Sequence, residues 1–327
     1  MGAMTGRRLR IRQLRWEAER VLSLELERAD GGELPPWSPG AHIDVHLPGA
    51  IIRQYSLCGT PTDRRRWRIA VLLEENSRGG SRAVHEVVRP GDELEVTGPR
   101  NNFPLLEADR YLFVAGGIGI TPLLPMVGRA DAMGADWRLA YGGRTRAGMA
   151  FADELCQRFG DRVSVVPQDE LGLLELDDLL AGVAPDARVY CCGPEPLLTA
   201  VEERCPAGQL HVERFTARAQ TSTGTNHESE FEVVLQGSGR RFRVQAGQSI
   251  LEAMEAEGIA APNSCREGIC GTCETKVLDG IPDHRDSLLS EEERAANQTM
   301  MICVGRALSD RIVLDLAPSG AGITAID

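Results

Sequence analysis

The stretch Cys265-Arg-Glu-Gly-Ile-Cys270-Gly-Thr-Cys273 holds three cysteines, and a fourth, Cys303, follows thirty positions after the last of them. The glycines at positions 268 and 271 have no Cβ, so the backbone between the cysteines can curl and point its N–H groups at the sulfur atoms. Four thiolates that converge from one wrapped loop and one distant strand predict a metal centre. We expect its ligands to be Cys265, Cys270, Cys273 and Cys303.

The spacing C-x4-C-x2-C with one distant cysteine resembles the loop of plant-type ferredoxins, which binds a [2Fe–2S] cluster. The resemblance continues through residues 274–280 and 300–305. A structural zinc site is the alternative, yet zinc sites usually consist of paired C-x2-C arms, and here only Cys270 and Cys273 form one. The resemblance implies an α+β ferredoxin domain of the β-grasp type, in which electrons are handled one at a time.

Residues 216–229 have almost no apolar side chains and are typical of a linker, so we expect the ferredoxin domain over residues 230–327. Within that domain, Gly237-Ser238-Gly239 between two apolar runs predicts a β-hairpin. The apolar pattern there predicts a helix at 249–257 and strands at 231–235, 240–244, 274–277, 300–304 and 312–316.

Before the linker, the pattern of apolar residues changes once more. Residues 7–108 consist of short apolar runs separated by glycine and proline turns, which predicts an antiparallel β-barrel. Its strands are expected at 9–14, 21–26, 43–47, 53–57, 68–73 and 93–97. Residues 109–215 alternate strands with helices, which predicts an α/β domain with a parallel sheet. There the strands are expected at 111–115, 137–141, 162–166 and 188–192, and the helices at 123–133, 150–159, 176–181 and 197–204.

Arg53-Gln54-Tyr55-Ser56-Leu57 lies on a predicted barrel strand and resembles the signature of the ferredoxin-reductase flavoprotein family. Over nearly all of residues 7–325 the chain resembles the phthalate dioxygenase reductase branch, and it is similar to vanillate O-demethylase reductase components. The resemblance implies that Arg53 neutralises the flavin phosphate, that Tyr55 packs along the flavin, and that Ser56 lies near the flavin N5 as a catalytic residue. The alternative is a solvated arginine, a core tyrosine and a strand serine.

The loop Arg78-Gly79-Gly80-Ser81 precedes a predicted short helix at 83–88. Glycines at a helix start expose backbone N–H groups to a phosphate, which Arg78 and Ser81 would also contact. In the branch that this chain resembles, such a loop binds the phosphate of FMN, so we expect FMN, with FAD as the alternative. Ser77 replaces the leading glycine of that branch. A flexible loop without a ligand is the other interpretation.

Two loops resemble those of ferredoxin-reductase nicotinamide domains. Gly116-Gly117-Ile118-Gly119-Ile120-Thr121-Pro122 resembles the loop whose glycines let the pyrophosphate approach the backbone. Cys192-Gly193-Pro194 resembles the loop whose cysteine sits beside the nicotinamide, so Cys192 is expected to be catalytic. Small buried residues before a turn are the alternative for the cysteine. The expected nicotinamide-binding residues are Gly116, Gly117, Gly119, Thr121, Cys192, Gly193 and Pro194.

Two more residues bear on the nicotinamide cofactor. Arg144 follows the second strand of the α/β domain, where the adenosine ribose should lie. An arginine there favours NADPH on physical grounds, but the branch that the chain resembles generally uses NADH and tolerates it, so we expect NADH. Phe215 closes the domain, and the resemblance implies an aromatic ring that covers the flavin and yields to the nicotinamide; a core phenylalanine is the alternative.

These modules predict electron transfer from NADH to FMN, then to [2Fe–2S], then to an external acceptor, because a hydride carries two electrons and the cluster accepts one. The three modules use up the 327 residues and leave no oxygenase domain. The resemblance implies a separate Rieske-type oxygenase or demethylase as the acceptor. A cytochrome P450 as acceptor and a non-enzymatic redox sensor are the alternatives.

The net charge of -12 argues against nucleic acid and anionic membranes as partners. From Glu228 onward, 9 basic residues face 17 acidic ones, which suits docking to a basic patch on the acceptor; solubility alone is the alternative. The odd count of nine cysteines argues against a disulfide framework. Since no apolar run is long enough to span a membrane and no secretory signal follows the basic start, we expect a cytoplasmic protein.

Overall fold

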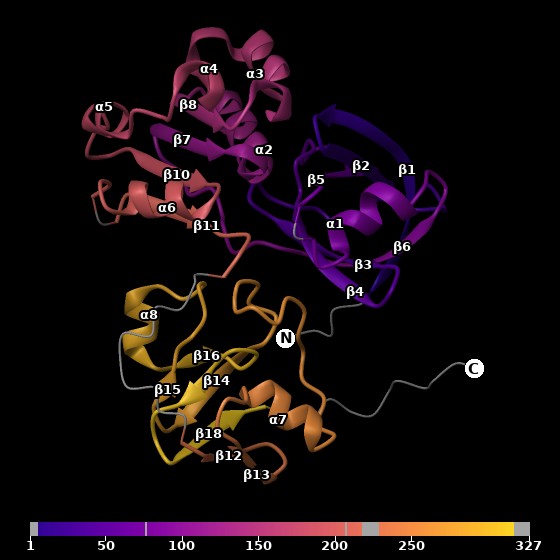
Figure 1. Cartoon of the computed structure of the whole chain (residues 1–327), viewed down its shortest axis with the longest axis vertical. Coiled ribbons are helices and arrows are strands. Elements are labelled where there is room, and N and C mark those ends of the chain that lie inside the picture. Colours follow the sequence, from indigo (N-terminus) through magenta and orange to yellow (C-terminus); the bar gives the residue numbers. More distant parts are fainter. Residues whose placement is uncertain (1–5, 76, 207, 218–228, 317–327) are drawn as a thin grey trace. The chain divides into compact units, whose positions relative to one another are not determined.

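The computed structural model describes residues 6–75, 77–206, 208–217 and 229–316. The chain divides into two compact units between Arg214 and Phe215 (Figure 1). The expected linker, 216–229, lies mostly outside the described residues. The first unit carries two separate sheets, whereas the boundary that we expect between residues 108 and 109 stays a prediction.

The first sheet is antiparallel, with strand order β4-β3-β6-β1-β2-β5. Its strands are β1 (Arg7–Ala18), β2 (Val21–Glu27), β3 (His42–Leu47), β4 (Ile51–Ser56), β5 (Trp67–Leu72) and β6 (Glu93–Arg100). The two outermost strands come together as in a barrel, because the Cys58 N–H just after β4 donates to the Arg68 carbonyl on β5, at 2.8 Å. All six predicted strands are confirmed, and their inward side chains form a closed apolar core.

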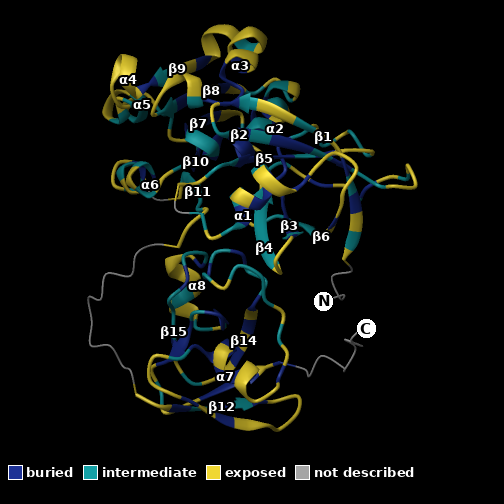
Figure 2. Cartoon of the chain, turned by 45° about the vertical axis from the view of Figure 1, so that its right-hand side comes forward, coloured by how far each residue is buried: buried dark blue, intermediate teal, exposed yellow. Residues whose placement is uncertain are grey.

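The second sheet is parallel, with strand order β11-β10-β7-β8-β9. Its strands are β7 (Arg110–Gly116), β8 (Asp136–Gly143), β9 (Val163–Pro167), β10 (Arg188–Cys192) and β11 (Leu210–Glu213). The helices between them are α2 (Ile120–Ala132), α3 (Ala152–Phe159), α4 (Gln168–Leu171), α5 (Leu176–Ala181) and α6 (Glu195–Glu202). The central strands are buried on both faces, as parallel strands usually are, and the helices expose their outer faces (Figure 2).

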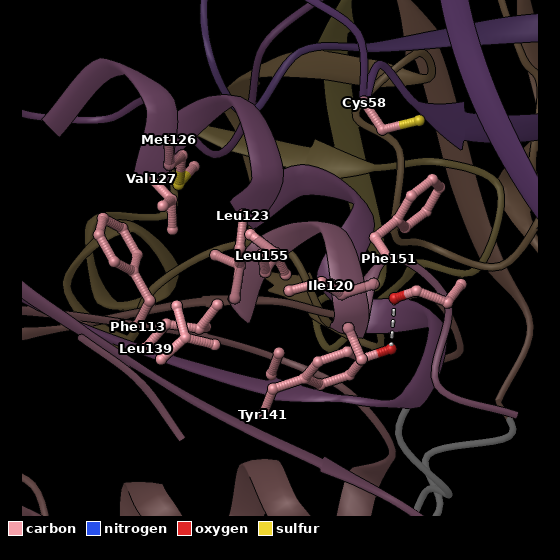
Figure 3. Packing of buried hydrophobic residues seen from close by; sticks show 14 of the residues in the cluster. Cys58, Phe113, Ile120, Leu123, Met126, Val127, Leu139, Tyr141, Phe151 and Leu155 are labelled. Atoms are coloured by element: carbon pink, nitrogen blue, oxygen red, sulfur yellow. Dashed lines mark hydrogen bonds between the residues drawn. The ribbon is translucent and has the colours of Figure 1, made fainter. Parts of the chain in front are cut away.

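The core of this second sheet lies between the strands and α2 and α3 (Figure 3). Phe113, Leu139 and Tyr141 point from the strands toward Leu123 and Leu155 on the two helices, and all five side chains are buried. The Tyr141 hydroxyl donates to the Ala150 carbonyl at 3.1 Å, so its one polar atom is satisfied inside the core. The same core takes in Cys58 and Phe103 from the barrel segment, which ties the two sheets together.

The second unit is a five-stranded mixed sheet, with order β13-β12-β18-β14-β16, covered by one helix. Its elements are β12 (Phe231–Leu235), β13 (Arg241–Val244), α7 (Ile250–Ala256), β14 (Glu274–Asp279), β16 (Thr299–Met301) and β18 (Arg311–Asp315). A small two-stranded ladder, β15 (Pro282–Asp283) with β17 (Arg306–Ala307), and a helix, α8 (Glu291–Ala296), complete it. The parallel pairing of β12 with β18 among antiparallel neighbours, with a helix across the sheet, is the expected α+β architecture.

One predicted strand is shorter than expected. The run 300–304 continues as a strand only to Met301, and a turn follows, in which the Gly305 N–H donates to the Met301 carbonyl at 2.8 Å. The turn carries Cys303 off the sheet edge and toward the cysteine loop. Among the described residues, no helix is long and apolar enough to cross a membrane.

Candidate functional site

The cysteine loop, residues 265–273, is compact because its backbone enters the left-handed region at Arg266, Gly268 and Gly271, with φ of 58°, 69° and 73°. Hydrogen-bond contacts between side chains join Cys265 to Cys270, Cys265 to Cys303, and Cys273 to Cys303. Three of the thiols are buried and that of Cys265 is half-buried. The structure therefore brings all four expected ligands together.

The donor set fits a two-iron cluster. The Glu267 nitrogen lies 3.3 Å from Cys265 Sγ and the Thr272 nitrogen 3.4 Å from Cys270 Sγ, so backbone N–H groups face the sulfur atoms. The hydrogen bond with the Cys265 thiol, and after it burial, raises the pKa of the Cys270 thiol, so thiolates here need a neighbouring cation. Among the described residues, no three His, Cys, Asp or Glu side chains are arranged to hold a single metal ion. A [2Fe–2S] cluster needs only two thiolates at each iron.

Strand β4 positions the expected flavin residues. Arg53 lies against the glycine loop: a Cβ on Gly80 would come within 2.5 Å of Arg53 Cγ, and a Cβ on Gly79, whose φ is 91°, within 2.7 Å of Ile51 Cδ1. The Arg53 guanidinium donates to the Arg78 carbonyl at 3.0 Å. Only glycines allow this close approach, so the structure brings the arginine of β4 and the Gly79-Gly80 pair together.

The predicted short helix at 83–88 is present, but it starts three residues earlier and ends one residue earlier. A single turn of α-helix, α1 (Gly80–Arg82), runs into a wider turn of π-helix, Ala83–Val87. The helix starts earlier because the Ser77 hydroxyl accepts the N–H groups of Gly79 and Arg82, at 3.2 Å and 3.4 Å. Ser77 also accepts a hydrogen bond from the Ser81 hydroxyl, at 2.9 Å, so the serine that departs from the family pattern holds the loop in shape.

The two expected nicotinamide loops pack glycine against glycine at the carboxyl ends of β7 and β10. A Cβ on Gly119 would lie 2.3 Å from the Cys192 carbonyl oxygen, and a Cβ on Gly193 would lie 2.9 Å from Gly116 Cα. A Cβ on Gly116 would also meet Pro194 Cδ at 2.6 Å. The chain therefore has no room for side chains at these positions, and the two loops lie in direct backbone contact.

Ser56, at the end of β4, and Cys192, at the end of β10, lie on either side of Glu213, a residue that was not selected from the sequence. The Ser56 hydroxyl donates to Glu213 Oε2 at 3.3 Å. Burial raises the pKa of Glu213 to about 8, although the Ser56 hydrogen bond lowers it. Burial, followed by the charge of Glu213, raises the pKa of the Cys192 thiol well above its usual value, so that thiol stays protonated.

Glu213 sits here because β11 extends the parallel sheet beside β10, with Glu213 opposite Cys192 in register. The next residue, Arg214, pairs with Glu195 and Glu202 on α6, at 3.1 Å and 2.7 Å, which anchors the end of the strand. One feature of the sequence could have pointed to Glu213. It is an acid within the short run His211-Val-Glu-Arg-Phe215, at a position where a buried strand would ordinarily carry an apolar residue.

Four predicted site residues remain, which are Arg144, Thr121, Phe215 and Tyr55. Arg144 is exposed at the end of β8, and its carbonyl accepts the Asp169 N–H at 3.2 Å. The Thr121 hydroxyl donates to the Ile118 carbonyl, at 3.0 Å, within its own loop. Phe215 is the first residue of the second unit and is 38% exposed, so its place over a flavin stays a prediction. Tyr55 is half-buried on β4, and burial raises the pKa of its hydroxyl, so it stays neutral.

Comparison with known proteins adds the family. Residues 233–308 match the model of the 2Fe-2S iron-sulfur cluster binding domain. The chain is 45% identical to the phenoxybenzoate dioxygenase subunit beta of Ectopseudomonas oleovorans, covering 94% of this chain and 97% of that protein. It is 42% identical to the vanillate O-demethylase oxidoreductase of a Pseudomonas species, covering 94% of this chain and 98% of that protein.

Solved structures agree. Phthalate dioxygenase reductase, described as a modular structure for electron transfer from pyridine nucleotides to [2Fe–2S], is 36% identical with a TM-score of 0.70, covering 95% of this chain and 98% of that one. An intact type IV self-sufficient cytochrome P450 monooxygenase is 45% identical with a TM-score of 0.88, covering 95% of this chain; this chain spans 41% of its length. Since these relatives are 36–45% identical over at least 94% of this chain, the chain belongs to the phthalate dioxygenase reductase-like family of oxidoreductases.

Proposed function

We propose that this chain is the reductase component of an oxygenase system, and that it passes electrons from NADH through FMN and a [2Fe–2S] cluster to a separate Rieske-type oxygenase or demethylase. The observation that carries the proposal is that Ser56 from the barrel donates to Glu213 at 3.3 Å, while Glu213 stands opposite Cys192 in the parallel sheet, in a chain that also gathers four cysteines. A flavin, when bound, accepts a hydride and releases its electrons singly, which matches the one-electron capacity of the cluster.

For the flavin, Arg53 and the loop Arg78-Gly79-Gly80-Ser81 would hold the phosphate, Tyr55 would lie along the ring system and Ser56 would face N5. The closeness of Gly80 to Arg53 supports one compact phosphate site, which suits the terminal phosphate of FMN. FAD is the alternative.

For the nicotinamide cofactor, the loops at Gly116–Gly119 and Cys192–Pro194 would hold the pyrophosphate and nicotinamide, and Arg144 would lie near the ribose. A second arginine in this loop, Arg146, is engaged by Glu170 through three contacts of 3.1–3.3 Å. An arginine already paired with a carboxylate is less available to a 2′-phosphate, which supports NADH over NADPH.

For the acceptor, the curated relatives are named as subunits or reductases of dioxygenase, demethylase and monooxygenase systems, which supports a separate partner. A cytochrome P450 is the second candidate, because the similar P450 chain carries a segment like this one within it. We also infer a cytoplasmic location, since all nine cysteines are free thiols in the structure.

An anaerobic titration of the purified chain with NADH, and separately with NADPH, tests the proposal. Flavin bleaching and the EPR signal of a reduced [2Fe–2S] cluster are followed together, and acid release identifies the flavin. Bleaching by NADH followed by the cluster signal is expected. Bleaching without a cluster signal would contradict the role of the four cysteines, release of FAD would contradict the FMN assignment, and no response to either donor would overturn the reductase function.

A further inference from the structure

Beside the cysteine loop lies a buried carboxylate that plays no part in the function proposed above. The side chain of Asp286 is 1% exposed. Its Oδ2 accepts the N–H groups of Leu288 and Leu289, at 3.0 Å and 2.8 Å, while its Oδ1 has no hydrogen-bond partner among the described residues. Burying a carboxylate with one unpaired oxygen costs folding free energy, so nearby groups of opposite charge are needed to offset that cost.

Two cationic or titratable groups face Asp286. Arg294, on α8, donates from Nη2 to the Asp286 carbonyl at 2.5 Å, and the same nitrogen lies 3.6 Å from Oδ2. His284 Nδ1 lies 3.8 Å from Oδ1, and its other ring nitrogen contacts the Asn297 amide oxygen at 3.3 Å. The Arg294 side chain is 32% exposed, so its charge is screened less than that of a free surface arginine.

The backbone of Asp286 touches the cysteine loop at its centre. A Cβ on Gly268 would lie 2.9 Å from Asp286 Cα, and the Ser287 N–H donates to the Gly268 carbonyl at 2.9 Å. Gly268 lies between Cys265 and Cys270 in the loop, and its own N–H faces the Cys303 sulfur. The backbone at Asp286 and Ser287 is therefore in direct contact with the ligand-bearing loop, and the Arg294 guanidinium is bound to the Asp286 carbonyl.

We propose that Asp286 and Arg294 are positioning residues that set the electron affinity of the cluster, the carboxylate lowering it and the guanidinium raising it. The inference rests on the proposed [2Fe–2S] function. Reduction adds one negative charge to the cluster, so a nearby anion opposes reduction and a nearby cation favours it, most strongly where water is excluded. The opposite charges of Asp286 and Arg294 partly cancel in their effect on the electron affinity of the cluster. The pair therefore fixes the geometry of the cysteine loop with only a small net change in that affinity.

Redox titration of the full-length holoprotein, followed by visible absorbance and EPR, tests this in the variants Asp286→Asn, Arg294→Gln and the double variant. At one fixed solution potential, the ratio of reduced to oxidised cluster should rise about 3- to 10-fold in Asp286→Asn and fall by a similar factor in Arg294→Gln, tenfold being 59 mV for one electron. The double variant should lie near the wild type. Glu292→Gln, which removes a charge from the exposed side of α8, is the matched control and should change the ratio less than about twofold.

Shifts of both single variants in the same direction, or no larger than that of Glu292→Gln, would overturn the inference. If Asp286→Asn does not retain its cluster, the comparison of Arg294→Gln with Arg294→Lys decides, because only the glutamine variant loses the positive charge and only it should lower the ratio. A wild-type chain that shows no [2Fe–2S] signal after reduction would instead overturn the proposed function, and the inference with it.

Discussion

At the scale of single residues, Glu213 links the two halves of the candidate active site. Its pKa of about 8 lies above the ordinary value of 4.5, so between these values the folded chain holds it protonated while the unfolded chain does not. The free energy of unfolding should therefore fall as pH rises from about 4.5 to about 8. Ionisation above pH 8 also places a negative charge beside Ser56 and Cys192.

We expect Glu213→Gln to remove this pH dependence. The variant should gain about 1 kcal/mol or more of stability over the wild type at pH 8.5 compared with pH 5. The rate of flavin reduction by NADH in stopped flow should fall severalfold across pH 8 in the wild type and stay flat in the variant. A wild-type rate that is flat across pH 8, or a variant that keeps the wild-type profile, would show that Glu213 does not titrate in the site.

Glu170 is the second residue with a testable role. Its carboxylate holds Arg146 in a two-pronged contact, although both side chains are about half exposed, so the pair contributes little to stability. In Glu170→Gln the guanidinium is free to meet a 2′-phosphate, so kcat/KM for NADPH relative to NADH should rise about 5-fold. Asp178→Asn, an exposed acid on α5, is the control. An equal change in both variants would mean that overall charge, not the pair, affects the preference.

At the scale of elements, Gly268 at the centre of the cysteine loop and Gly258 in the same unit share a left-handed backbone conformation. Gly268 and Gly258 have φ of 69° and 67°, but a Cβ on Gly268 would meet Val304 Cγ2 at 2.7 Å, whereas nothing lies within 4 Å of a Cβ on Gly258. Both alanine variants should lose about 1 kcal/mol from backbone strain. Only Gly268→Ala should also lose most of its cluster, measured as iron per chain and as visible absorbance. Full iron content in Gly268→Ala would contradict the packing argument.

The sequence predicts the main elements of all three sheets because strand and helix periods in the apolar residues are local signals. It misses β11 and α4 in the first unit. It also misses β15 and β17, which have two residues each and form through the pairing of Asp283 with Arg306. It also misses α8, although the capping box Ser290–Glu293 was a readable start. Arg306 was not selected either; it is buried, and its guanidinium donates to the carbonyls of Gln245, Gln248 and Ser229.

At the scale of the candidate sites, motif spacing brings together the right loops, since the four cysteines and the two glycine loops do converge. What spacing could not give is the residue supplied from another element. Glu213 reaches Ser56 only because β11 adds to the edge of the parallel sheet, and Asp286 reaches Gly268 only through a loop that returns from β15. Such partners depend on the tertiary fold and leave no local period in the sequence.

At the scale of the whole molecule, the charge is uneven, and this asymmetry bears on how electrons leave. Residues from Glu228 onward carry 9 basic against 17 acidic side chains, while the preceding 227 residues carry 27 against 31. An acidic ferredoxin unit should attract a basic acceptor electrostatically. Salt weakens this attraction, because the screening length falls to about 10 Å at 0.1 M. Electron transfer to a basic acceptor should therefore depend on ionic strength, whereas reduction of the flavin by NADH should depend on it much less.

We expect the second-order rate of reduction of cytochrome c, a basic protein, to fall about tenfold between 20 mM and 300 mM salt. Flavin bleaching by NADH, measured in the same buffers, is the internal control and should change less than about twofold. Replacing the exposed acids Glu291 and Glu292 of α8 by glutamine removes two of the 17 acidic charges and should lower the low-salt rate and flatten the salt dependence. A salt-independent rate in the wild type would mean that the acidic residues serve solubility, and that the acceptor is recognised through uncharged contacts.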